Sequence, residues 1–432
     1  MNKLVLLAAL VAAWFAIAPA ANAATLITGP TNMTADADGD NEVDIAINPL
    51  NTKNLVSAWN DYGSNSCGIG TSFDGGQTWS IDYLHGIDFT TYDYGAGDPS
   101  LGFLNDGTAV ITCNAWSVSK PTALYTSYST DGGRSWAAPS KVASEGNLGK
   151  NIDHPMLTID KYNNRVLLSY SIWNGSYVAN SYALVSADGG RSYNGPYRIA
   201  ADYRANSVDV FDSSLAGAPD GTIYATTGIW QYVNDWNEQA VVVSQLRPGE
   251  TAFTRSVKVR DLTPAPYTLP GEEWRTSMQA SIGVESNGTV DLLTGDFVTG
   301  ALDLYLARSA DHGRSFPQQV DLTNNPLGRD VVMPWSSVTP GGRIDIVYYD
   351  YSEASGTMSA VYGQVARGGS TFAARLTLQS GIDGDAQPPR GAGHTPFWGD
   401  YIGIDSTDRL VATAWTCNGP ASQDVCAATV RP

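Results

Sequence analysis

The sequence has little positive charge, and no Arg occurs before Arg134. Among 432 residues, 25 are Lys or Arg and 43 are Asp or Glu, which gives a formal net charge of −18. Such a charge repels polyphosphates and anionic lipid surfaces, so neither nucleic acid nor a membrane is the expected partner. An acidic ligand would need a local group of Arg side chains.

Long hydrophobic runs are missing beyond the N-terminus, where Leu4–Ile17 is the one extended apolar stretch. No later segment approaches the 18 residues that a membrane-spanning helix needs. Lys3, this stretch and the small residues Ala21-Asn22-Ala23 follow each other in the order of a signal peptide. We therefore expect residues 1–23 to be a signal peptide and residues 24–432 to form one secreted or periplasmic domain.

Cysteine is scarce, with four residues and no C-x-x-C pair. In an exported chain this favours disulfides over metal thiolates. Cys417 and Cys426 flank a short polar loop and are expected to join two adjacent strands. Cys67 and Cys113 lie in neighbouring repeats and could pair between them.

One octapeptide pattern, S-x-D-x-G-x-[ST]-aromatic, occurs four times. The copies are Ser72–Trp79, Ser129–Trp136, Ser186–Tyr193 and Ser309–Phe316. The first three recur every 57 residues, and the fourth follows about two periods later. A fixed period of this length is typical of repeat folds. Because Asp accepts backbone N–H groups of its own turn and Gly-Gly permits positive φ, each copy predicts a hairpin turn.

The spacing also predicts the number of repeats. Weaker copies at Ser244–Phe253 and Arg367–Phe372 place an Arg near the position of the Asp, so those turns should be held differently. Seven units can be traced, and Ala24–Gly29 could supply the strand missing from the last one. We predict an all-β, seven-bladed β-propeller with four-stranded antiparallel blades, closed by this N-terminal strand.

The octapeptide resembles the Asp-box (BNR) repeat of sialidases and related exported β-propellers, over nearly the whole chain after residue 23. The resemblance implies turns on the face away from the active site, with a six-bladed propeller as the alternative. It also implies three Arg that grip a substrate carboxylate. Arg275 and Arg390 could take two of these roles, but the Arg-Ile-Pro motif that should precede the first copy is absent; Tyr197-Arg198-Ile199-Ala200 follows the third copy instead.

Polar residues open the innermost strands, which converge at one mouth of a propeller. They are Glu42, Asp44, Asp98, Asp153, His154, Asp212 and Asp400. Converging carboxylates perturb one another's pKa, as acid/base pairs for glycoside chemistry require. The alternative is that they cap loop turns and pair with Arg. The predicted catalytic residues are Glu42, Asp98, Asp212, Glu273, Asp350, Tyr351 and Tyr401.

Two pairs could supply the Tyr–Glu nucleophile that the sialidase resemblance implies: Tyr351 with Glu353, and Tyr401 with Glu273. The predicted substrate-binding residues are Arg275, Arg329, Arg390, His154, Trp59, Trp116, Trp173 and Trp230. The four Trp end the second strands at intervals of 57 residues. They could stack on sugar faces or pack between blades.

A metal-like run, Asp36–Asp44, contains alternating carboxylates. Asp36, Asp38 and Asp40 could bind calcium, which prefers oxygen ligands, or could form a solvated acidic turn. No other cofactor is expected.

The sequence leaves three functions open for a monomer that binds a glycan or glycoconjugate. The first is a sialidase-like glycoside hydrolase acting on sialylated or other acidic glycans. The second is a non-catalytic propeller that binds glycan or protein, and the third is a uronate polysaccharide lyase that uses Tyr, His154 and Arg.

Overall fold

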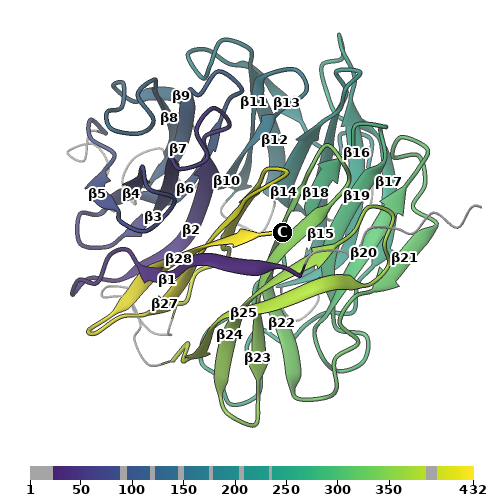
Figure 1. The fold of residues 1–432 in the computed structure, drawn as a ribbon. Coiled ribbons are helices and arrows are strands. Elements are labelled where there is room, and N and C mark those ends of the chain that lie inside the picture. The colour runs from purple at the N-terminus through teal and green to yellow at the C-terminus, as the bar shows by residue number, and fades with distance from the viewer. Residues whose placement is uncertain are drawn as a thin grey trace, which may run out of the picture.

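The chain forms a ring of seven four-stranded antiparallel sheets in a computed structural model (Figure 1). The structure describes residues 23–87, 95–116, 122–144, 150–174, 179–203, 209–232, 236–385 and 397–432. The predicted seven-bladed propeller is confirmed, and the six-bladed alternative is excluded. No helix in the described ranges has the length and apolar character needed to span a bilayer.

The first four blades follow the chain in order. Blade one holds β2 (Asp40–Ile47), β3 (Leu55–Asp61), β4 (Ser66–Ser72) and β5 (Ser80–Tyr83). Blade two holds β6 (Gly95–Phe103), β7 (Ala109–Trp116), β8 (Ala123–Ser129) and β9 (Ser140–Ser144). Blade three holds β10 (Lys150–Asp160), β11 (Arg165–Asn174), β12 (Ala179–Ser186) and β13 (Asn194–Arg198). Blade four holds β14 (Asp209–Gly217), β15 (Ile223–Tyr232), β16 (Trp236–Leu246) and β17 (Thr254–Asp261).

The last three blades complete the ring. Blade five holds β18 (Ser281–Val284), β19 (Val290–Asp296), β20 (Asp303–Ser309) and β21 (Gln318–Asp321). Blade six holds β22 (Arg329–Val338), β23 (Ile344–Ser352), β24 (Thr357–Val365) and β25 (Phe372–Ile382). Blade seven holds β26 (Gly403–Ser406), β27 (Val411–Asn418), β28 (Gln423–Arg431) and β1 (Thr25–Asn32).

Closure of the ring joins the two ends of the described chain. Strand β1 pairs antiparallel with β28, from Thr25 opposite Arg431 to Asn32 opposite Cys426. The prediction that an N-terminal strand completes the last blade is therefore confirmed, and β28 is not left with an unpaired edge.

The four octapeptides form the turns between the third and fourth strands of their blades, as predicted. In the first copy, Asp74 Oδ1 accepts the backbone N–H groups of Gln77 and Thr78 at 3.0 Å, and its Oδ2 accepts the Thr78 hydroxyl at 2.6 Å. Gly75 and Gly76 have φ of 80° and 86°, which favours glycine. We call these four structures the motif turns.

The weaker copy in blade four is held by another residue, as expected. There Glu250 accepts the backbone N–H of Arg247 at 2.9 Å and pairs with Arg255.

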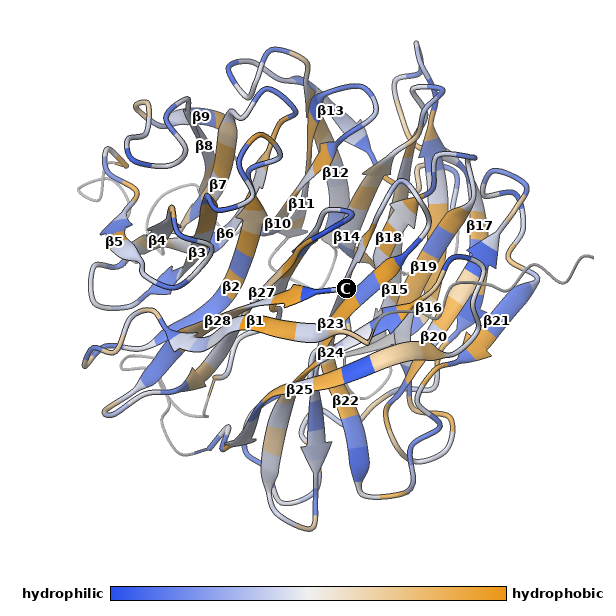
Figure 2. Ribbon diagram, viewed as in Figure 1, coloured by the Kyte–Doolittle hydropathy of each residue, from blue (hydrophilic) through white to orange (hydrophobic). Residues whose placement is uncertain are grey.

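Both predicted disulfides are present, Cys67–Cys113 between blades one and two and Cys417–Cys426 within blade seven. The core lies between adjacent blades, where apolar residues alternate along the strands (Figure 2). Trp59, Trp398 and Trp415 are among its largest buried side chains.

Candidate functional site

A repeated backbone irregularity marks one mouth of the ring. Five innermost strands carry a bulge near their start, where register with the second strand shifts. A non-glycine residue with positive φ occupies each bulge: Glu42 (55°), Asp98 (47°), His154 (47°), Asp212 (55°) and Met333 (50°). Such backbone costs on the order of 1 kcal/mol or more per residue and is concentrated at functional sites. Four of the five side chains are titratable, and these four line two adjoining cavities.

The larger of the two cavities, of about 280 Å³, is mainly apolar, with several aromatic residues in its wall. Its wall includes Trp173, Phe211, Trp230, Met278 and Phe297. The Phe211 ring centroid lies 4.4 Å from that of Trp173 and 5.0 Å from that of His154. We call this space the aromatic cavity; its flat apolar surfaces suit the faces of sugar rings.

The smaller cavity, of about 210 Å³, is polar. Its wall includes Glu42, Asn60, Tyr62, Asp98 and Trp116. We call it the acidic cavity. Both cavities are also lined by Asp153, His154, Arg275 and Asp400, which we call the ridge because these four residues border both spaces.

The ridge is an ion-pair network. Arg275 grips Asp400 with two nitrogens, one of them Nε at 2.8 Å from Oδ1. On the other side of Asp400, His154 Nε2 lies 3.4 Å from Oδ2. The second ring nitrogen of His154 lies 3.4 Å from Asp212 Oδ1, so one imidazole links two carboxyl groups. Gln279 Nε2 lies 3.0 Å from that same nitrogen.

The pKa values of Asp212 and Asp400 are shifted in opposite directions. Burial raises the pKa of Asp212 to about 7, although the charge of His154 acts against this shift. Burial also acts on Asp400, but Arg275 and His154 outweigh it and hold the pKa of Asp400 well below its usual range. Burial disfavours the charged imidazole, yet Asp212 and Asp400 raise the pKa of His154 to about 10. At neutral pH, His154 and Asp400 are charged while Asp212 is partly protonated.

The acidic cavity contains a second carboxyl pair. Asn60 Nδ2 donates to Glu42 Oε2 at 2.5 Å, and Asn60 Oδ1 accepts the backbone N–H of Asp98 at 2.6 Å. Burial raises the pKa of Glu42, with Asp400 adding to it; burial and the charge of Glu42 raise the pKa of Asp98 well above its usual range. The two carboxyl groups therefore keep their protons to higher pH than isolated carboxyl groups do.

Neither tyrosine meets the glutamate that the sequence suggested. The Tyr351 hydroxyl donates to Glu272 Oε1 at 2.6 Å rather than to Glu353, and burial together with Glu272 raises its pKa. The Tyr401 hydroxyl donates to the carbonyl of Pro99 at 3.2 Å. Glu273 is exposed, and its backbone N–H donates to Asp385. Neither tyrosine lines either cavity, because both are buried among neighbouring strands.

The predicted Arg and Trp residues are divided among several places. Arg329 pairs with Asp350 outside both cavities, and Arg390 lies outside the described residues. Trp173 and Trp230 line the aromatic cavity and Trp116 the acidic one. Trp59 is only 1% exposed and packs in the core, so the inter-blade alternative holds for this residue.

Asp44, which also opens an innermost strand, does not reach the two cavities. It accepts Ser100 Oγ at 2.8 Å and the backbone N–H of Leu101 at 2.9 Å, linking blade one to blade two. Sequence reasoning missed Asn60 and Phe211 as site residues. Their positions in the sequence could have indicated both, because Asn60 directly follows Trp59 and Phe211 directly precedes Asp212.

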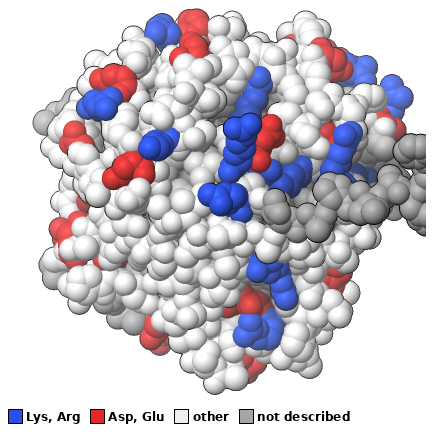
Figure 3. Space-filling model, viewed as in Figure 1, with Lys and Arg blue, Asp and Glu red and all other residues white. Residues whose placement is uncertain are grey.

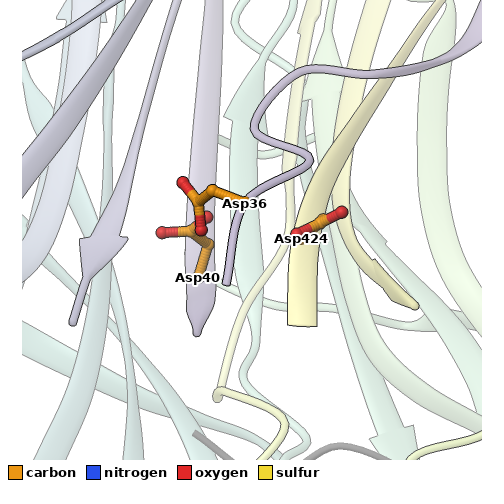
Figure 4. A group of neighbouring side chains, drawn as sticks. All are labelled: Asp36, Asp40 and Asp424. Carbon is orange, nitrogen blue, oxygen red and sulfur yellow. The ribbon is translucent and has the colours of Figure 1, made fainter. Parts of the chain in front are cut away.

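Of the predicted calcium residues, two belong to a carboxylate cluster. One oxygen each of Asp36, Asp40 and Asp424 lies within 4.8 Å of the others, and Asp38 is not part of the cluster (Figure 4).

On the face of the molecule in Figure 3, acidic and basic side chains are interspersed.

Comparison with known proteins gives structural neighbours of low identity. An ulvan lyase of polysaccharide lyase family PL25 is 11% identical with a TM-score of 0.54, covering 92% of this chain and 95% of that chain. The GH93 α-L-arabinofuranosidase of Fusarium graminearum is 15% identical with a TM-score of 0.50, covering 93% and 98%. The Hadza microbial sialidase Hz136 is 13% identical with a TM-score of 0.49, covering 87% and 73%. No family model and no curated protein matches. At these identities the similarity shows the propeller fold alone.

Proposed function

We propose that this protein is a glycoside hydrolase that cleaves its substrate over the ridge, with Asp212 as the general acid. The observation that carries the proposal is the opposite pKa shift of Asp212 and Asp400 across one imidazole. Two carboxyl groups whose environments separate their pKa values can act as the general acid and the charge-stabilising carboxylate of a glycosidase.

In the proposed reaction, Asp212 gives its proton to the leaving glycosidic oxygen as the bond from that oxygen to the anomeric carbon breaks. Asp212 Oδ1 faces a ring nitrogen of His154 at 3.4 Å but makes no hydrogen bond within the described residues. The ionised Asp400 stabilises the positive charge that develops on the sugar. Asp153 lines both cavities and is assigned the role of base for the water that adds to the anomeric carbon.

The charge around the ridge favours a neutral sugar over a sialic acid. Arg275 and Arg329 each hold an Asp, so neither guanidinium is free to grip a substrate carboxylate in the described structure. The described lining of the two cavities contains seven carboxyl groups and two cationic groups, His154 and Arg275; the carboxyl groups are Glu42, Asp61, Asp98, Asp153, Asp212, Asp296 and Asp400. We therefore expect neutral glycosides to be the preferred substrates and acidic glycans to be poorer ones.

Two structural neighbours support a glycan as the ligand class. The F. graminearum enzyme has been solved in complex with arabinobiose, and the ulvan lyase has been solved bound to -[GlcA(1-4)Rha3S]-. Both have the fold of this chain, and the aromatic cavity offers sugar-sized apolar walls.

The test is a panel of chromogenic glycosides that includes α-L-arabinofuranosides, neutral hexosides and a sialoside. We expect turnover of a neutral glycoside by the parent protein and its loss in Asp212→Asn, with ligand binding retained. Asp74→Asn, which removes the same charge from a motif turn, is the matched control and should keep full activity.

The other outcomes identify the alternatives. Turnover confined to the sialoside would restore the sialidase interpretation. An unsaturated, ultraviolet-absorbing product from a uronate polymer would indicate a lyase. Binding without any turnover, and full binding by Asp212→Asn, would indicate a non-catalytic glycan-binding propeller.

A further inference from the structure

Three carboxylates from the two ends of the chain meet where the ring closes (Figure 4). Asp36 lies in the connection from β1 to β2, Asp40 is the first residue of β2, and Asp424 lies near the start of β28. Blade seven and blade one therefore both contribute to the cluster. One oxygen of each carboxylate lies within 4.8 Å of the other two.

Two of these carboxylates are buried and incompletely bonded. Asp40 is 1% exposed and Asp424 is 0% exposed. Within the described structure, one oxygen of each, Asp40 Oδ2 and Asp424 Oδ1, has no hydrogen-bond partner. A buried carboxylate oxygen without a donor or cation is costly, so this arrangement calls for a positive ligand.

We propose that Asp36, Asp40 and Asp424 bind one Ca²⁺ ion, which clamps the closure of the ring. All three side chains offer oxygen, the ligand type that Ca²⁺ prefers. With Ca–O distances of 2.3–2.6 Å, oxygens on opposite sides of the ion are about 4.6–5.2 Å apart, and those on the same side are closer. The observed 4.8 Å limit fits this sphere.

The surrounding contacts hold the site in place. The Asn32 amide donates to Asp424 Oδ2 at 2.5 Å, and Thr34 Oγ1 accepts the backbone N–H of Val425 at 3.1 Å. The backbone N–H of Met33 donates to the Val425 carbonyl at 2.7 Å. Residues 32–34 are thus docked on β28, and an ion would attach the following residues, Asp36 and Asp40, to the same strand.

The test compares thermal unfolding and calorimetric titration of the chelator-treated protein with Ca²⁺ and with Mg²⁺. We expect one Ca²⁺ per chain and a rise of several degrees in the unfolding midpoint at millimolar Ca²⁺, because an ion that binds only the folded chain stabilises it. Mg²⁺ should have a smaller effect, since it demands a tighter octahedral site.

Asp36→Asn and Asp38→Asn form a matched pair for this test. Asp36 is exposed, so its variant should fold, but Ca²⁺ should bind more weakly by at least tenfold and the thermal shift should largely disappear. Asp38→Asn removes the same charge two residues away, outside the cluster, and should retain the full shift. Absence of Ca²⁺ binding by the parent protein, or equal loss in the two variants, would overturn the proposal.

Discussion

An Asp in a motif turn and Asp212 at the mouth of the ring have pKa shifts in opposite directions. In a motif turn, hydrogen bonds from Thr78 lower the pKa of Asp74 to about 2, and the carboxylate lies near solvent. Beside the ridge, in the wall of the aromatic cavity, burial raises the pKa of Asp212 to about 7. The turn surrounds its carboxylate with donors, whereas the mouth withdraws Asp212 from water, and the neighbouring charges of His154 and Asp400 act on its pKa in opposite directions.

This difference shows where a carboxyl group can act as an acid. Asp74 is fixed by four donor groups and stays ionised, so it can stabilise a turn but has no proton to give at neutral pH. Asp212 retains a fraction of its protons at neutral pH, as a general acid must. Exchanging or removing these groups should therefore have separable effects on activity and on stability.

The largest expected effect is on catalysis. Asp212→Asn should lower kcat for a neutral aryl glycoside by about 10²–10⁴-fold, the usual contribution of a general acid. For substrates whose leaving group needs no protonation, the decrease in kcat should be smaller. Steady-state kinetics on a series of leaving groups would reveal this difference. Equal losses across the series would argue that Asp212 does not protonate the leaving group.

A smaller but still large effect is expected on stability from Arg275→Met. It leaves Asp400, whose side chain is 7% exposed, beside His154 without its bidentate partner. The free energy of unfolding should fall by about 1–2 kcal/mol, less than for a fully buried ion pair, because the Arg275 side chain is itself 39% exposed. Arg329→Met is the control, because its partner Asp350 is 21% exposed, compared with 7% for Asp400; denaturant titration should show a loss of about 0–1 kcal/mol.

The fold could be predicted from the sequence because its signals are local and repeated. The 57-residue period, the Gly-Gly turns and the apolar strands predicted the seven blades, the closure by β1 and the motif turns. These features depend on local chemistry repeated many times, so each copy supports the others. Both disulfides could also be predicted. Cys67 and Cys113 lie in adjacent repeats, which neighbouring blades bring together, and Cys417 and Cys426 flank a short loop between adjacent strands.

The site is less predictable because it depends on side-chain pairing between blades. The openings of the innermost strands predicted one shared mouth for Glu42, Asp98, His154 and Asp212, and in the structure these residues line the two adjoining cavities from equivalent bulges in four blades. Spacing alone could not show that Tyr351 bonds to Glu272. That contact joins residues 79 positions apart through a loop that the repeat does not define.

The pH dependence of catalysis should reveal the link between His154 and Asp212. In the parent protein, kcat/KM should fall as pH rises through about 7, because Asp212 then loses the proton that the reaction needs. The imidazolium of His154 favours ionised Asp212, so His154→Gln should raise that pKa and move the falling limb to higher pH. If the falling limb stays in place in His154→Gln, the charge of His154 does not control the pKa of the catalytic acid. Asp74→Asn is the control and should leave the pH profile unchanged.

The smallest expected effect is on the stability of one motif turn. Asp74→Asn weakens the acceptor of Gln77 and Thr78, and should lower the free energy of unfolding at pH 7 by about 1 kcal/mol. The pKa of Asp74 is about 2 in the folded chain and about 3.9 in the unfolded chain, so its charge stabilises the fold above pH 4. That contribution is lost as pH falls from about 4 to 2. Denaturant titrations should therefore show the difference between parent and variant shrinking over this interval, whereas a constant difference would mean that packing, not charge, holds the turn.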